Sequence, residues 1–243
     1  MQNKPAGLNS PQKKKFETQN ANIVGSKNKV VSSKNNKSDW KYLVIDTETT
    51  GLDPKTDLIH QISGCIIVNA KIVEFFDFNI NIDDKYYKEN GLEPKNAYQE
   101  FVNILDKYVN KFDKMDKFFL LGYNVTFDKN FLEQFFKQNG NNYFYSYIWG
   151  PNNLDVMTLA SFNIRKERRN LKDFKQGTVA EYLGINVSTK NLHNSLYDII
   201  ICIEIFCIVT GENIENIATI YLLKSLIQDD RNISIWEINQ MLK

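Results

Sequence analysis

The strongest constraint on the fold is a run of four apolar residues, Tyr42 to Ile45, that stops abruptly at Asp46. A short apolar run bounded in this way is typical of a buried β-strand. Residues 58–68 and 71–80 are rich in β-branched and aromatic side chains and are separated by only two residues, a pattern that predicts a β-hairpin. This part of the chain is therefore expected to form a strand followed by a hairpin.

The rest of the chain alternates between strand and helix patterns. An apolar run at 118–123 predicts another buried strand, and 143–149 is expected to form the last one. Apolar residues at helical spacing predict helices over 96–112, 126–138, 154–162, 171–183, 193–209, 213–227 and 234–242. This order predicts an α/β domain with a mixed sheet, in which an antiparallel three-stranded meander is extended by parallel strands.

Composition divides the chain at about residue 40. Residues 1–40 hold eight lysines and two acids, which gives a charge of +6; because the whole chain is +1, the remainder carries −5. Residues 1–39 are rich in Lys, Asn and Ser, lack a periodic apolar pattern and are expected to be a disordered tail. We expect the catalytic or binding domain to span 40–212, with a helical extension over 213–243 packed on it.

Cysteine usage and hydropathy favour an intracellular protein. Cys65, Cys202 and Cys207 form no Cys-x-x-Cys pair and lie in apolar stretches, so buried reduced thiols are expected. The first 40 residues lack the apolar segment of a secretory signal, and no apolar run has the length of a membrane span. We therefore expect a soluble, cytoplasmic protein that has no membrane partner.

Three segments carry residues suited to a catalytic metal site. Asp46 and Glu48 are two apart on an extended segment, so both side chains point to one face, and hard cations prefer carboxylate oxygens. Asp128 begins a helix after a buried strand, where an acid also suits the helix dipole. His193 and Asp198 begin a long apolar helix and could flank one reaction centre. Taken singly, each segment is more often explained by solvated acids or by the ordinary start of a helix than by a catalytic site.

Together, the three segments resemble the motifs of the DEDDh exonucleases, the DnaQ-like family that includes the proofreading epsilon subunit of bacterial DNA polymerase III. The first motif, D-x-E-T-T-G, is intact at 46–51. The second, usually H-N-x-x-F-D, is present at 123–128 with Tyr123 in place of His. The third, H-x-A-x-x-D, is present at 193–198 with Ser195 in place of Ala.

Weaker similarities extend this resemblance over roughly residues 41–208. The stretch D-V-M-T-L-A at 155–160 resembles the family's D-T-L-x-L-A, and A-E-Y-L-G-I at 180–185 resembles its helix that ends in L-G-I. Gln61 stands where several members carry Glu, which could alter the positions of water or sugar near the metals. Neither Gln61 nor Tyr123 removes an expected metal ligand.

The resemblance implies an RNase H-like mixed five-stranded sheet with helices on both faces. It also implies a 3′→5′ exonuclease that hydrolyses phosphodiester bonds with two divalent cations, Mg²⁺ or Mn²⁺. Asp46 is then expected to bridge both ions, Glu48 and Asp198 to complete one, and Asp128 to hold the second directly or through water. His193 is expected to be the general base, since the pKa of histidine lies near neutral pH.

Substrate binding is expected to involve the loop after the first motif and two residues of the second motif: Thr49, Thr50, Gly51, Leu52, Asn124 and Phe127. Gly51 permits close backbone approach, and Asn124 could bond a phosphate or sugar. Phe127 could stack on the terminal base, although core packing is equally compatible with its position. The basic run over 165–175 could track a phosphate backbone or form a solvated helix face.

The resemblance implies the 3′ end of DNA, single-stranded or frayed, as the substrate. The motifs do not distinguish the sugars, so an exoribonuclease similar to RNase T or oligoribonuclease is the first alternative. A nucleic-acid-binding or polymerase-associated module that no longer cuts is the second, and the five intact motif residues argue against it. Association with a DNA polymerase partner stays open.

Overall fold

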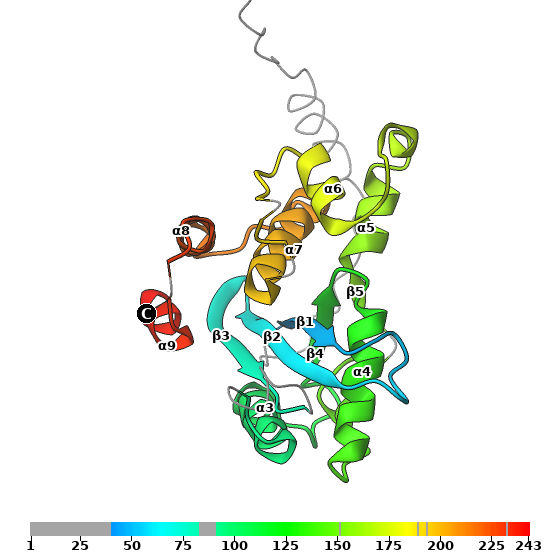
Figure 1. Ribbon diagram of the computed structural model, residues 1–243, viewed down its shortest axis with the longest axis vertical. Coiled ribbons are helices and arrows are strands. Elements are labelled where there is room, and N and C mark those ends of the chain that lie inside the picture. The colour runs from blue at the N-terminus through cyan, green and yellow to red at the C-terminus, as the bar shows by residue number, and fades with distance from the viewer. Residues whose placement is uncertain (1–39, 83–90, 151, 189, 193, 232) are drawn as a thin grey trace, which may run out of the picture. The chain divides into compact units, whose positions relative to one another are not determined.

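The computed structural model describes residues 40–82, 91–150, 152–188, 190–192, 194–231 and 233–243 (Figure 1). The predicted tail, 1–39, and the predicted general base, His193, lie outside the described residues. The strands are β1 (Lys41–Thr49), β2 (Ile59–Val68), β3 (Lys71–Asn79), β4 (Phe118–Gly122) and β5 (Leu154–Asp155). The helices include α3 (Pro94–Tyr108), α4 (Thr126–Gln138), α5 (Val156–Asn163), α6 (Gln176–Tyr182), α7 (Ser195–Thr210), α8 (Ile217–Gln228) and α9 (Ile235–Met241).

The described strands form one mixed sheet in the order β3-β2-β1-β4-β5. β1 and β3 both pair antiparallel with β2, and β4 pairs parallel with β1 and with β5. The hairpin between β2 and β3 turns at Asn69 and Ala70, which have φ values of 49° and 68°. Two central residues with positive φ give the turn the twist that neighbouring strands require. The predicted mixed five-stranded sheet is confirmed.

Side chains of β1 alternate between two cores on opposite faces of the sheet. Leu43 and Ile45 belong to the core that α3 and α4 cover, whereas Tyr42 and Val44 belong to the core that α5, α6 and α7 cover. Figure 1 shows these helices on the two sides of the sheet. The period of two residues along a strand explains the alternation, and it also decides where the acidic end of β1 points.

The last strand lies later in the chain than the sequence predicts. Residues 143–149 contain a short 3₁₀-helix, Phe144–Ser146, and join the sheet only through a single bridge from Ile148 to Phe118. Phe144 and Tyr147, three residues apart, are both buried and both contact Phe136. This spacing of three suits a 3₁₀ turn better than a strand, so the prediction of a strand here is wrong.

The fifth strand, β5, falls within the segment predicted to begin a helix. Its residue Asp155 caps α5, because the carboxylate accepts hydrogen bonds from the backbone N–H groups of Met157 (2.9 Å) and Thr158 (3.3 Å). A residue in this capping role has an extended backbone, so the helix can begin only after it. Helix α6 is also shorter than expected and begins at Gln176.

The C-terminal helices α8 and α9 pack against α7 and β3, respectively. Ser234 and Glu237 form the capping box that their spacing predicts at the start of α9. Cys65 and Cys202 are buried free thiols, and Cys207 is a half-buried one. Among the described residues, no helix is both long enough and apolar enough to cross a membrane.

Candidate metal centre

The carboxyl end of β1 and the first turn of α7 bring three carboxylates together. Asp46 and Glu48 continue the alternation of Tyr42 and Val44, so they point to the face of the sheet that α7 covers. Asp198 lies in the first turn of α7. One oxygen from each of these three side chains lies within 4.8 Å of the others. Such a group of oxygens is suited to a hard divalent cation.

Asp128, the third residue of α4, reaches β1 from the opposite face of the sheet. Its Oδ1 accepts two hydrogen bonds of 2.9 Å, one from the backbone N–H of Thr47 and one from the Thr47 hydroxyl. Asp128 is only 4% exposed, so these bonds compensate part of the cost of burial. Asp128 is therefore fixed beside β1 but does not belong to the group of three. Thr47 is a positioning residue that motif comparison alone did not identify.

Two serines fix the start of α7 over the sheet. The hydroxyls of Ser63 on β2 and Ser195 on α7 lie 2.6 Å apart and are fully buried. Ser63 donates to Asp77 on β3 at 2.6 Å, so Ser195 must be the donor to Ser63. An alanine, usual in the family at this position, lacks that hydroxyl. The bond spans 132 residues of sequence and helps to hold the helix that carries Asp198.

Gln61 lies beside this network. Its Cα is paired with that of Glu48 across the β1–β2 ladder, and its side-chain amide donates to Asp77 at 2.8 Å. The side chain is thereby bonded to β3. A glutamate at this position could not donate that hydrogen bond, since an ionised carboxylate only accepts. The amide therefore fits the neighbouring aspartate.

Burial and mutual repulsion make these acids harder to ionise. The pKa of Asp46 is raised well above its ordinary value, chiefly by burial and further by the charges of Asp128, Asp198 and Glu48. Burial also raises the pKa of Asp128 to about 7, although the hydrogen bonds from Thr47 oppose the shift. A bound cation would relieve this repulsion. The electrostatics therefore favour a metal at this position.

This arrangement leads to a prediction about pH. Without divalent cations, we expect the free energy of unfolding to fall as pH rises from about 4 towards about 7, because the unfolded carboxylates ionise near pH 4 and folded Asp128 only near pH 7. In this window the folded state binds more protons than the unfolded state. The free energy of unfolding therefore decreases with pH, by on the order of 1 kcal/mol per pH unit for each such group. Urea unfolding at several pH values measures it. Millimolar Mn²⁺ should abolish the fall; a metal-free stability that rises through this window would contradict the prediction.

The loop after β1 is braced by its own contacts. The Thr49 hydroxyl donates to the Gly51 carbonyl at 2.7 Å, and Thr50 bonds to Leu58 through both its N–H and its hydroxyl, each at 2.9 Å. A Cβ on Gly51 would lie 2.4 Å from Asp57 Oδ2. Glycine is therefore favoured here by a close contact with another residue of the same loop. Leu52, in the same loop, is 84% exposed.

The second motif forms a tight turn between β4 and α4. Asn124 is exposed with a φ of 62°, and its N–H donates to Asp155 Oδ1 at 3.2 Å. Asp155 thus joins this turn to the start of α5. Phe127 is partly buried, with its ring 4.8 Å from that of Phe131. Tyr123 donates through its hydroxyl to the Phe174 carbonyl at 2.7 Å, a contact that the usual histidine could not reproduce in the same form.

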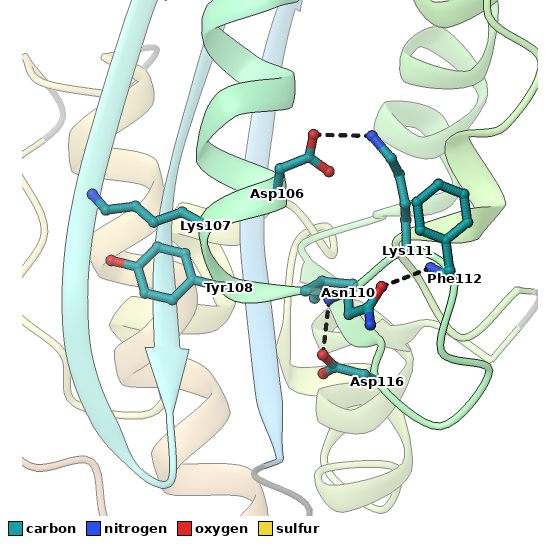
Figure 2. A pocket seen from close by; sticks show the side chains of 8 residues that line it. Asp106, Lys107, Tyr108, Asn110, Lys111, Phe112 and Asp116 are labelled. Atoms are coloured by element: carbon teal, nitrogen blue, oxygen red, sulfur yellow. Dashed lines mark hydrogen bonds and ion pairs between the residues drawn. The ribbon is translucent and has the colours of Figure 1, made fainter.

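A hollow of about 520 Å³ lies elsewhere, between the end of α3 and the following loop (Figure 2). Asp106, Lys111 and Asp116 are among its lining residues. Lys41, the first residue of β1, bonds to Asp116 at 2.5 Å. The hollow is therefore at the opposite end of β1 from the carboxylates and is not part of the candidate metal centre.

The mixed sheet and the acidic residues at the end of its central strand define a protein of the RNase H-like nuclease class. The chain belongs to the RNase T-type exonuclease family, whose model matches residues 43–206. This match confirms the resemblance to the DnaQ-like, DEDDh exonucleases.

Several known proteins are similar to the chain. PolC-type DNA polymerase III of Mycoplasmopsis pulmonis is 24% identical over 182 residues, which is 69% of this chain and 11% of that protein. Ribonuclease T of Buchnera aphidicola is 25% identical over 191 residues, which is 68% of this chain and 81% of that protein. The chain thus spans about a tenth of the polymerase relatives that it matches.

Solved structures of exonuclease I have the same fold. The zinc-bound complex of the E. coli enzyme with single-stranded DNA superimposes with a TM-score of 0.57 at 19% identity, over 78% of this chain and 45% of that one. The complex of the same enzyme with a dT13 oligonucleotide gives a TM-score of 0.56 at 18% identity, over 77% of this chain and 43% of that one.

Proposed function

We propose that this protein is a 3′→5′ exonuclease that hydrolyses the terminal phosphodiester bond of DNA with two divalent cations, Mg²⁺ or Mn²⁺. The observation that carries the proposal is the meeting of Asp46, Glu48 and Asp198 within 4.8 Å at the end of the central strand. Membership of the exonuclease family supports it. When bound, the cations stabilise the charge that develops at the phosphate and at the leaving 3′ oxygen.

Each acidic residue has a distinct part in this proposal. Asp46 would hold both cations, Glu48 and Asp198 would complete the ligands of one, and Asp128 would hold the other directly or through water. Thr47 orients Asp128 through its two hydrogen bonds. His193 takes the proton from the attacking water, in keeping with its place in the third motif. These roles leave water as the nucleophile and the chain's own imidazole as the proton acceptor.

The 3′ end of the substrate meets two parts of the chain in this proposal. The loop of Thr49, Thr50, Gly51 and Leu52 offers backbone groups and the exposed Leu52 side chain. From the second motif, Asn124 bonds the terminal phosphate or sugar, while the partly buried Phe127 presents its remaining surface to the last base. Stacking and backbone contacts of this kind bind any sequence.

RNA is the second candidate substrate. The ribonuclease T relative supports it, because the match covers 81% of that protein's length. The polymerase relatives instead support action beside a DNA polymerase, since the matching part lies within a much longer polymerase chain. The two substrates differ at the 2′-hydroxyl, and a site that bonds this group rejects DNA.

Degradation of 5′-labelled DNA and RNA substrates of matched sequence tests which of the two the protein cleaves. We expect single-stranded DNA to be shortened stepwise in the presence of Mg²⁺ or Mn²⁺, faster than duplex DNA, because the strand end must be unpaired to reach the carboxylates. A faster rate on RNA of the same sequence would favour the ribonuclease candidate. Binding of the oligonucleotides with no cleavage of any of them would support the non-catalytic alternative.

A further inference from the structure

The connection between α5 and α6 is strongly basic and exposed. Six cationic residues within 165–175 stand against two acids, for a net charge of +4, although the chain beyond residue 40 carries −5. The six are Arg165, Lys166, Arg168, Arg169, Lys172 and Lys175, and all are exposed. None of them forms an ion pair with a carboxylate of the part of the chain that the structure describes. Their charge is therefore available to an anionic partner.

Two aromatic rings are interleaved with these cations. The guanidinium of Arg165 lies 4.5 Å from the centre of the Phe162 ring, which is 70% exposed. The guanidinium of Arg168 lies 5.0 Å from the centre of the Phe174 ring. Each arginine also donates to a nearby backbone carbonyl, Arg165 to Phe162 at 2.6 Å and Arg168 to Leu171 at 3.3 Å. Positive groups combined with one exposed ring, that of Phe162, suit the backbone and bases of a single strand.

Two hydrogen bonds join this connection to the candidate metal centre. The Tyr123 hydroxyl donates to the Phe174 carbonyl at 2.7 Å, and the Gln176 side-chain amide donates to the Asp198 carbonyl at 2.6 Å. The first bond reaches the second motif and the second reaches a proposed metal ligand. Helices α5 and α6 both pack on α7, and Figure 1 shows the yellow-green connection between them on the same side of the sheet as α7.

We infer that residues 162–175 bind the phosphate backbone of single-stranded nucleic acid and guide the strand to the carboxylates. This inference rests on the proposed nuclease function, because it assigns the substrate beyond its terminal nucleotide to this surface. Phe162 stacks with a base, and the lysines and arginines contact successive phosphates. Tyr123 and Gln176 are positioning residues that hold the surface beside the second and third motifs.

A charge-matched pair of triple variants tests the inference. The test variant is Lys166→Gln/Arg169→Gln/Lys172→Gln, and the control is Lys71→Gln/Lys95→Gln/Lys114→Gln, whose lysines are also exposed and lie on β3, on α3 and in the loop before β4. The probe is a labelled oligothymidylate of about 20 nucleotides. Its affinity is measured by fluorescence anisotropy over a range of salt concentrations, with Ca²⁺ in place of Mg²⁺ to suppress cleavage.

We expect the test variant to bind the oligothymidylate on the order of tenfold more weakly than the wild type, with a salt slope smaller by about 2, since each lost phosphate contact on a single strand removes about 0.7. The control should match the wild type. A second variant, Phe162→Ala, should weaken binding on the order of tenfold with an unchanged slope, because stacking releases no counterions. Test and control variants with equal affinities and equal slopes would overturn the inference.

Cleavage of a dinucleotide separates this inference from the proposed function. A dinucleotide has a single internal phosphate, which the carboxylates themselves act on, so the test variant should lose far less activity on it than on the oligothymidylate. A wild-type protein that cuts neither dinucleotide nor oligonucleotide would refute the proposed nuclease, while the anisotropy comparison would still decide whether this surface binds a single strand.

Discussion

Replacing Asp46 with asparagine is expected to lower the rate of phosphodiester hydrolysis by about a thousandfold or more. Asp46 is one of the three carboxylates of the candidate metal centre, together with Glu48 and Asp198, and an amide is a weak ligand for a hard cation. Metal ions supply several kcal/mol of transition-state stabilisation, and each 1.36 kcal/mol is worth a factor of ten. Single-turnover cleavage of a labelled single strand at saturating Mg²⁺ measures the effect.

The same substitution should stabilise the metal-free protein. Because burial and the neighbouring charges raise the pKa of Asp46, its ionised form is unfavourable in the folded state. Asp46→Asn removes that charge without changing the side-chain volume, so the melting temperature without cations should rise. Glu100→Gln, on the exposed side of α3, is the control and should change neither property. Near-normal activity in Asp46→Asn, or a lower melting temperature, would contradict the assigned role.

Replacing Glu204 with alanine is expected to destabilise the fold by about 3 kcal/mol or more. Glu204 on α7 and Lys224 on α8 form an ion pair of 2.5 Å in which both side chains are only 8% exposed. The alanine variant leaves the lysine buried without its counterion. Urea unfolding measures the loss, and the activity of the folded fraction should be unchanged because neither Glu204 nor Lys224 belongs to the group of carboxylates in the candidate metal centre.

A double variant shows what the pair itself contributes. Burial raises the pKa of Glu204 and the nearby lysine opposes that shift, and the cost of burying two charges can offset the benefit of their mutual attraction. Glu204→Leu/Lys224→Met removes both charges and should therefore be more stable than Glu204→Ala. A double variant that is destabilised relative to the wild type as much as Glu204→Ala is would indicate that the pair is strongly stabilising in itself.

Local sequence patterns predict much of this fold. The apolar run before Asp46 forms β1, the segment 126–138 forms α4 with the predicted bounds, and the residue alternation sends Asp46 and Glu48 to one face. These features depend on periodicity within a single element, which the sequence displays directly. The fifth strand could not be recognised in this way, because β5 has only two residues and its pairing with β4 depends on tertiary contacts.

The supporting contacts of the candidate site are also hidden from local patterns. Thr47 holds Asp128 across 81 residues, and Ser63 meets Ser195 across 132. Nothing in the residues themselves selects these partners, because many threonines and serines have the same donors. They become identifiable only when the strand register and the position of α7 are known.

The measurement that tests the central claim most directly is the polarity and metal dependence of cleavage. Single-stranded DNA labelled at its 5′ end is incubated with Mg²⁺ or Mn²⁺, with its 3′ end either free or blocked by an inverted nucleotide. We expect stepwise shortening from the free 3′ end, strong inhibition by the block, and no cleavage when EDTA removes the cations. Cleavage that persists in EDTA, or that proceeds equally well from a blocked 3′ end, would contradict a metal-dependent 3′→5′ exonuclease.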